Sequence, residues 1–361
     1  MITALLVLSP AAHTDQTPDR FEKLVARSDY RTALWSAALL QKGLMGGGCF
    51  SGSAKVEFGI VGPADAQFVD GRVWPVSGVW HTFVDYRFAM CPDDGFRAKF
   101  SIIAHPQATP IVLAVVPGRS ASSYRLKTVL HDQLTAAVRR ITEREDCPYP
   151  IIMNSQPTQF LDSAPGITTT REVWTVRACD RVADFFIDIE WDPTTQTTSF
   201  NTRVATDETT GHSFREIGVP APIYEDDGRL KTLAAEALSE DSAIRLEARK
   251  ALQFLADSNV PEAQYHLAVS LAHDPGGNRK LELEGLYWAA RSTANGSADG
   301  AHLAGKIVEN GPHLAPPDLR TAALLYRRAE EMGASQAAED YQRLVTAHPW
   351  LPKILKDLPI L

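Results

Sequence analysis

The sequence predicts an α+β N-terminal domain, built of antiparallel strands with one or two packed helices, followed by an all-α solenoid of helix-turn-helix repeats. Two observations predict this division. Alternation of apolar and polar residues, which is typical of strands, is confined to the first part of the chain, whereas helical periodicity with many alanines fills the last part. A length of 361 residues also exceeds the size at which a single hydrophobic core usually stops growing.

Composition narrows the classes of function. With 44% hydrophobic and 22% charged residues, the chain has the average make-up of globular proteins. The net charge is −8, and neither half carries a basic tail or a strongly basic segment of the kind that binds nucleic acid or anionic membranes. No segment approaches the run of about 18 apolar residues that a membrane-spanning helix needs. We therefore expect neither a nucleic-acid partner nor a membrane span.

The first elements follow from local patterns. Asp19 can cap a helix together with Glu22, and the apolar positions of that helix continue to Leu44, before a run of glycines. Beyond it, alternating residues over 96–102 and a continuous apolar run over 111–116 predict two strands. An apolar stripe over 126–141 then predicts a second amphipathic helix, and alternation resumes over 185–191.

Two hairpins in this half have similar sequences. In the first, Tyr86 is followed five residues later by a cysteine, a short turn and an alternating strand that starts at Phe96. Trp174 and Phe185 occupy the corresponding places in the second hairpin. The similarity indicates a duplicated unit, although chance is an alternative, because Trp and Cys are simply good strand residues.

The ends and the cysteines bear on the compartment. Residues 1–18 hold a short apolar run followed by small residues, as at the end of a secretory signal, but no basic start. They are either a truncated signal or a disordered lead. An even number of cysteines without a CxxC pair favours two disulfides, and hence a periplasmic or secreted protein; free thiols would place it in the cytoplasm. The duplicated unit favours Cys49 with Cys91 and Cys147 with Cys179, although three connectivities are open.

A catalytic reading of the N-terminal half has one candidate nucleophile. Cys49 follows two glycines whose backbone could supply oxyanion donors, and three histidines are available as bases: His81, His105 and His131. The surroundings match no cysteine-protease pattern, and a glycine run at a helix end is ordinarily a C-terminal cap. HExxH, GxGxxG, phosphate-loop and GxSxG motifs are absent. We therefore assign no catalytic residue, no cofactor and no metal.

An internal repeat is the most informative feature of the C-terminal half. A polar stretch over 206–228, punctuated by Pro and Gly, separates the halves. Beyond it, the sequence aligns with itself, so that His266 meets His302, Leu267 meets Leu303 and, one residue later in register, Trp288 meets Leu325. A weaker upstream copy places Leu233 and Phe254 at the positions of Leu267 and Trp288. Each unit reads as helix, loop, helix.

At these positions the sequence resembles Sel-one-like repeats, relatives of tetratricopeptide repeats, over residues 230–344. The matching residues are small or aromatic and recur in two units: Ala263, Leu267, Trp288 and Gly296 in one, and Ala304, Tyr326, Ala329 and Gly333 in the next. Leu325 departs from the pattern where an aromatic residue is expected, and the upstream unit matches poorly. The resemblance implies an α-solenoid that binds another protein or peptide in a scaffolding or adaptor role. It covers about a third of the chain, and the N-terminal half resembles no family.

Helical spacing selects the candidate binding residues. If the apolar positions of the first helix in each repeat face inward, six polar residues face outward as contacts for a partner: His266, Ser270, His273, His302, Lys306 and Glu309. The alternative is that they are solvated helix-face residues without a partner. The two aligned histidines lack further metal ligands. The apolar tail from residue 348 onward either caps the last repeat or docks a partner.

Together these patterns predict a truncated signal or disordered lead over 1–18, a disulfide-containing α+β domain over 19–205, a linker over 206–228 and a solenoid over 229–361. The function expected is non-catalytic protein binding in the bacterial cell envelope. A hydrolase or a sensor of small ligands or peptides, housed in the N-terminal domain, is the alternative.

Overall fold

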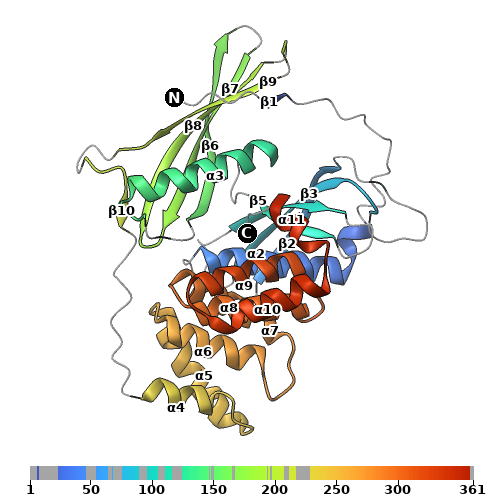
Figure 1. The fold of residues 1–361 in the computed structure, drawn as a ribbon, viewed down its shortest axis with the longest axis vertical. Helices are drawn as coiled ribbons and strands as arrows, with labels where there is room; N and C mark the ends of the chain where they lie inside the picture. Colours follow the sequence, from blue (N-terminus) through green and yellow to red (C-terminus); the bar gives the residue numbers. More distant parts are fainter. Residues whose placement is uncertain are drawn as a thin grey trace.

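Two antiparallel sheets, each with a helix on one face, and a set of consecutive helices make up the part of the chain that the structure describes (Figure 1). In the computed structural model, the residues described are 6–7, 23–45, 54–63, 67, 75–88, 96–104, 110–115, 124–145, 147, 150–164, 167–192, 194–195, 197–206, 211–216 and 228–357. The N-terminal region is thus an antiparallel sheet region and the C-terminal region is helical, as predicted.

The first sheet contains four strands in sequence order, joined to helix α2 (Ser28–Leu44) on one face. These strands are β2 (Ala54–Pro63), β3 (Val79–Phe88), β4 (Phe96–Ile103) and β5 (Ile111–Val115). Alternate residues of β3, including Trp80 and Val84, are buried against α2, because successive side chains of a strand point to opposite faces. The Trp80 indole donates a hydrogen bond to the Tyr30 hydroxyl of α2 at 3.1 Å. The helix predicted to run from Asp19 to Leu44 is interrupted at Arg27, which is extended: residues 23–26 are helical, and α2 begins at Ser28.

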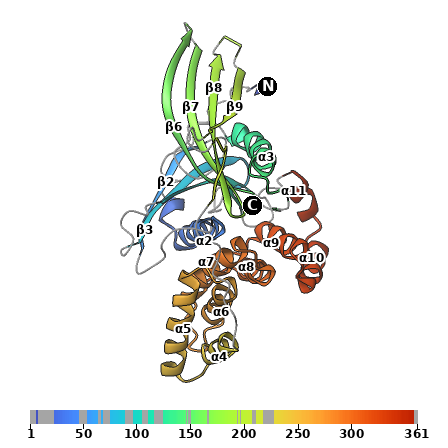
Figure 2. The same ribbon diagram turned by 90° about the vertical axis from the view of Figure 1, so that its left-hand side faces the viewer.

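The second sheet has six strands, and helix α3 (Tyr124–Ile141) packs on it. Its strands are β1 (Leu6–Val7), β6 (Ile151–Ala164), β7 (Ile167–Ala178), β8 (Arg181–Asp192), β9 (Thr197–Val204) and β10 (Arg215–Glu216). The order is β1-β9-β8-β7-β6, with β10 paired to β8. Figure 2 shows β6 to β9 as a tall twisted sheet beside α3. Parts of the predicted lead and linker, β1 and β10, therefore lie in strands.

The two sheets follow the same order of elements, helix and then four antiparallel strands. The corresponding hairpins also share their register: Tyr86 lies opposite Phe96, and Trp174 lies opposite Phe185. Cys147, which follows α3, forms a disulfide with Cys179 at the end of β7, with Cα atoms 5.8 Å apart. This is one of the two favoured pairings; Cys49 and Cys91 lie outside the described residues. The bond ties the end of the helix to the β7–β8 turn.

From α4 to α10, each helix of the C-terminal region contacts the next along the chain, whereas α11 contacts α9; α4 with α6 and α6 with α8 are also in contact. The helices are α4 (Arg229–Glu236), α5 (Ser242–Asp257), α6 (Pro261–Ala272), α7 (Leu281–Ala294), α8 (Ala298–Asn310), α9 (Leu319–Glu331), α10 (Ser335–Ala347) and α11 (Leu351–Asp357). Side-chain caps fix several starts: Asp241, Ser297 and Asp318 each accept hydrogen bonds from backbone N–H groups one or more residues into their helices.

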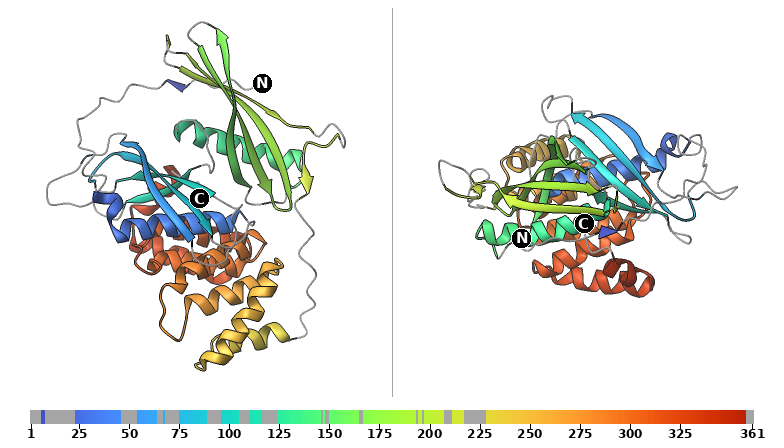
Figure 3. Two further views of the ribbon diagram at one scale, coloured as in Figure 1. Left: turned by 180° about the vertical axis from the view of Figure 1, so that it is seen from behind. Right: turned by 90° about the horizontal axis from the view of Figure 1, so that it is seen from above.

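The buried side chains group differently from the predicted domain boundaries. One core joins α2, the first sheet and helices α4 to α11, whereas a second core joins α3 with the second sheet. Figure 3 shows α2 between the first sheet and the helical region. In the tail, Leu351 and Leu355 of α11 are buried in the first core, and α11 packs on α9. The first sheet and the helical region therefore stabilise one another.

Candidate functional site

The predicted binding face of α8 lies against α10. His302 Nε2 is 2.7 Å from Asp340 Oδ2, and Lys306 Nζ is 3.6 Å from the same oxygen. Arg343, one turn further along α10, donates hydrogen bonds of 2.7 and 2.8 Å to the two carboxylate oxygens of Glu309. These five side chains form one charged cluster, which we call the α8–α10 network.

Hydrogen bonds set the charge states in this network. Burial would raise the pKa of Asp340, but hydrogen bonds with His302 and Arg343 outweigh burial and hold that pKa below its usual value. The same balance lowers the pKa of Glu309, which accepts hydrogen bonds from Arg343 and from the Tyr326 hydroxyl. Burial, followed by the bond to Glu309, raises the pKa of Tyr326. At neutral pH both carboxyl groups are ionised and Tyr326 is neutral.

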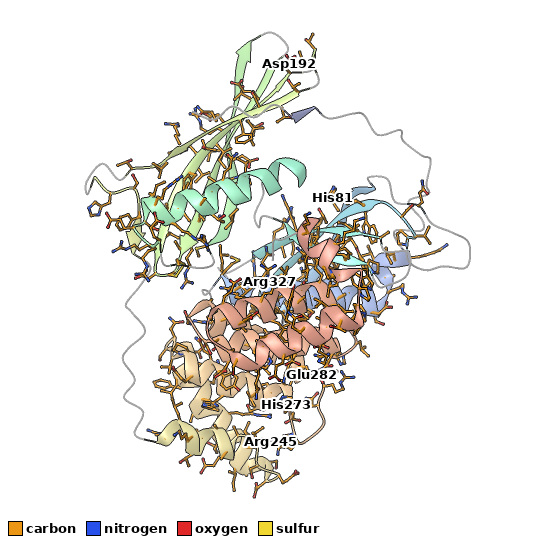
Figure 4. The ribbon with its side chains drawn as sticks, in the orientation of Figure 1. His81, Asp192, Arg245, His273, Glu282 and Arg327 are labelled. Atoms are coloured by element: carbon orange, nitrogen blue, oxygen red, sulfur yellow. A yellow bond between two sulfur atoms is a disulfide. The ribbon has the colours of Figure 1, made fainter. Side chains whose placement is uncertain are left out.

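The corresponding residues of α6 have different surroundings. Ser270 is fully buried, and its hydroxyl donates to the Leu267 carbonyl of the same helix at 2.8 Å. His266 is half-buried, with its ring 5.2 Å from that of Tyr265. His273 is exposed at the C-cap of α6, on the helical region where Figure 4 labels it.

The expectation that all six residues face outward is therefore corrected for two of them. Ser270 is buried with its hydroxyl bonded to its own helix, and His302 is buried with its ring bonded to Asp340 of α10. Lys306 and His273 are exposed. The structure brings His302, Lys306 and Glu309 together, but binding of a partner by any of the six stays a prediction.

A second cluster, at the α6–α7 loop, was not identified from the sequence. The buried carboxylate of Asp274 lies 3.5 Å from Arg245 Nε and 2.8 Å from an Arg249 nitrogen, and it also accepts from the Asn278 backbone N–H. Burial by itself would raise the pKa of Asp274, but these hydrogen bonds and ion pairs outweigh burial and hold that pKa below its usual value. Arg249 also donates to the Ser270 carbonyl. The cluster joins α5 to the next helix pair, and only the tertiary contact reveals it.

Exposed large hydrophobic side chains in the described part of the chain lie only in the helical region. Four of them belong to α5 or the loop before it, and one lies in the α8–α9 loop: Leu238, Ile244, Leu246, Phe254 and Leu314. Phe254 is 74% exposed, although it is the largest of the five. These side chains are the large hydrophobic groups that the helical region leaves exposed to water.

Only two residues of the catalytic alternative, His81 and His131, lie in the described part of the chain. Cys49 and His105 lie outside the described residues, and His131 lies on α3. His81 Nδ1, on β3, is 2.8 Å from Ser101 Oγ on β4, in the first sheet (Figure 4). Ser101 is fully buried, so its hydroxyl has no access to a substrate in this structure.

Metal-ligand groups, membrane-spanning helices and similarity to known proteins give no further candidate site in the described residues. Within the part of the chain that the structure describes, no group of three or more His, Cys, Asp or Glu side chains is placed to hold a metal ion. Among the described helices, none combines the length and apolar character that crossing a membrane requires. No protein-family model, curated protein or solved structure matches this chain.

Proposed function

We propose that this chain is a non-catalytic scaffold of the bacterial cell envelope that binds a protein partner through its helical region. In this proposal, α4 to α9 are three Sel-one-like repeats, and α10 and α11 close the array as a short solenoid. The support for stacking is that each helix from α4 to α9 contacts its successor, and that α4 contacts α6 and α6 contacts α8. Such stacks present long surfaces for other proteins.

One observation carries the binding role. The exposed large hydrophobic side chains of the described residues are gathered on the helical region, and mostly on α5 and its preceding loop. Apolar area left in water costs roughly 25 cal/mol for each Å². A partner that covers this patch would recover that free energy, whereas a catalytic role would not require it.

The disulfide supports the proposed compartment. Cys147 and Cys179 are joined, and such bonds persist in oxidising compartments. Non-reducing peptide mapping of the protein from its native host should show this pair bridged in nearly all molecules. Recovery of both as free thiols would place the protein in the cytoplasm and overturn the envelope assignment.

Photo-crosslinking in the full chain tests the binding role. A benzophenone amino acid is placed in the helical region at Leu238, His273 or Lys306, and on the second sheet at Asn201 or Thr202; all five positions are exposed. We expect the helical positions to yield one common protein adduct in the native host, and the sheet positions to yield none. Adducts only from the sheet positions would overturn the proposal, and so would the absence of any protein adduct.

A further inference from the structure

Two buried arginines occupy equivalent places in successive repeats. The alignment of the two repeats places Arg291 of α7 at Arg328 of α9. Both residues lie in the last turn of their helices, and both are 6% exposed. Arg291 donates hydrogen bonds to two neutral groups, the Tyr287 hydroxyl at 3.1 Å and the Asn259 side-chain oxygen at 2.8 Å. The second helices of the two repeats therefore carry guanidinium groups at corresponding places near their C-terminal ends.

A third arginine reaches this place from the second sheet. Arg177, near the end of β7, donates a hydrogen bond of 2.9 Å from Nη1 to the carbonyl of Met45, the C-cap residue of α2. Helix α2 packs closely on α7, since a Cβ added at Gly43 would lie 3.2 Å from the backbone nitrogen of Arg291. Arg177 and Arg291 therefore lie at the same end of α2. Nε of Arg177 bonds the Cys179 carbonyl, and Nη2 makes no hydrogen bond within the described part of the chain.

The three guanidinium groups lie close enough to affect one another's charge. Burial, followed by the charge of Arg177, lowers the pKa of Arg328 to about 9. Burial also lowers the pKa of Arg177, and the charge of Arg291 adds to this effect, whereas Asp180 opposes it. The Asp180 carboxylate is largely exposed and lies 3.1 Å from Arg144. The surroundings therefore disfavour the positive charges of Arg177 and Arg328, because like charges repel more strongly where water is excluded.

We call Arg177, Arg291 and Arg328 the arginine cluster, and it lies where the two large cores meet. Arg177 belongs to the sheet that packs on α3, whereas the other two belong to helices of the first core. The buried side chains of the two cores form separate clusters. Units of one chain that keep separate cores move relative to each other unless a large apolar interface joins them. A small displacement of the second sheet would therefore admit a ligand to the cluster.

We propose that the arginine cluster binds a multivalent oxyanion of the phosphate class between the second sheet and helices α7 and α9. A guanidinium group donates paired N–H groups that match the oxygens of a phosphate. An anion with two or more negative charges would offset the repulsion among three facing cations. It would also hold the second sheet against the helical region. This inference goes beyond the proposed function and does not depend on the exposed hydrophobic side chains.

Capping of α2 is the alternative role of the arginine cluster. A cation near the C-terminal end of a helix interacts favourably with the helix dipole, and Arg177 bonds the Met45 carbonyl there. One cation is enough for that interaction, and each further cation adds repulsion. A purely capping role predicts no response to phosphate-class anions beyond the effect of ionic strength, so binding measurements separate the two roles.

Thermal unfolding of the full chain with inorganic pyrophosphate tests the proposal. Pyrophosphate should raise the midpoint of an unfolding transition by about 2 °C or more, relative to sodium chloride of the same ionic strength. Arg177→Gln should abolish most of this shift and weaken the calorimetric affinity at least about tenfold. Arg203→Gln removes one positive charge from an exposed residue of the same sheet, and as the matched control it should keep the full shift.

A second variant and two further anions complete the test. If Arg177→Gln fails to fold, Arg177→Lys, which keeps the charge but not the paired N–H groups, should weaken the affinity at least about threefold. Inorganic phosphate should compete with pyrophosphate, and citrate that binds as tightly would overturn the assignment to the phosphate class. A shift no larger than that of sodium chloride would overturn the site itself. An undiminished affinity in the Arg177 variants, or an equal loss in Arg203→Gln, would do the same.

Discussion

At the scale of residues, Asp340 binds three cationic or hydrogen-bonding side chains at once, His302, Lys306 and Arg343. A carboxylate accepts several hydrogen bonds, so one residue of α10 satisfies donors from two helices. Surface ion pairs taken singly contribute little to stability, but a network with shared partners fixes the geometry of several side chains together. The α8–α10 network therefore sets how α10 lies against α8.

The α8–α10 network makes the stability of the folded protein depend on pH. Because the pKa values of Asp340 and Glu309 are lower in the folded state than their ordinary 3.8 and 4.5, ionised carboxylates favour folding. Their contribution is complete at neutral pH and is lost as pH falls below about 4. In urea titrations, Asp340→Asn should cost about 1 kcal/mol at pH 7 and much less near pH 3. An equal cost at both pH values would contradict this account.

Gly43 tests the contact between α2 and α7. Alanine normally stabilises a helix by about 1 kcal/mol relative to glycine. Here the added Cβ would meet the Tyr287 carbonyl at 2.5 Å, and a backbone atom has little room to move. Gly43→Ala should therefore lower the free energy of unfolding by about 1 to 3 kcal/mol. Ser28→Ala, at the exposed start of the same helix, is the control and should change it by less than about 0.5 kcal/mol. A stabilised Gly43→Ala variant would show that the helices are further apart.

At the scale of elements, α5 and α7 have aligned sequences, but the aligned side chains Phe254 and Trp288 differ in burial. Substituting each of them measures how this difference affects stability. Trp288→Ala removes a fully buried side chain and should cost about 3 to 5 kcal/mol in chemical denaturation. Phe254→Ala removes an exposed one and should cost less than about 0.5 kcal/mol. A large cost at Phe254 would mean that α5 is covered in solution, and the patch would then no longer support partner binding.

The elements themselves were largely predictable, because hydrophobic periodicity is a local signal. The stripe over 126–141 became α3, alternation over 96–102 became β4, and the aligned hairpins share their register. A local signal does not show which element of the fold packs against a given face of a helix or sheet. Nothing in the sequence around Gly43 indicates α7, and so the first sheet was assigned to a different unit from the helices it stabilises.

The candidate site was predicted less well for the same reason. Spacing on α8 correctly grouped His302, Lys306 and Glu309 on one side of the helix. It could not foresee that Asp340 and Arg343 of α10 would occupy that side, since helical periodicity says which residues share a face but not what lies against it. Phe254 was noted as a repeat position, and only the structure shows that it lacks the cover that its equivalent has.

At the scale of the whole molecule, two large cores hold most of the buried hydrophobic side chains of the described residues, beside a small cluster of three alanines on α8, α9 and α10. Because α2, the first sheet and the helices share one core, and α3 with the second sheet form another, we expect two unfolding transitions. Trp288→Ala should lower the midpoint of one transition, and Trp174→Ala should lower the other. Hydrogen exchange resolved by mass spectrometry would assign the segments. A single transition shifted by both variants would show that the cores are coupled.

The packing of α2 against α7 also bears on how the chain acquires its structure. Helix α2 emerges early in synthesis, but the helix that covers it is made in the last third of the chain. Closing such a distant contact is slow, and an uncovered apolar helix invites aggregation while it waits. Strands β6 to β9 of the second sheet directly follow α3 in sequence, and they have no such delay. The unit synthesised first is therefore completed last, and a chaperone that shields α2 in the interval would raise the yield of native protein.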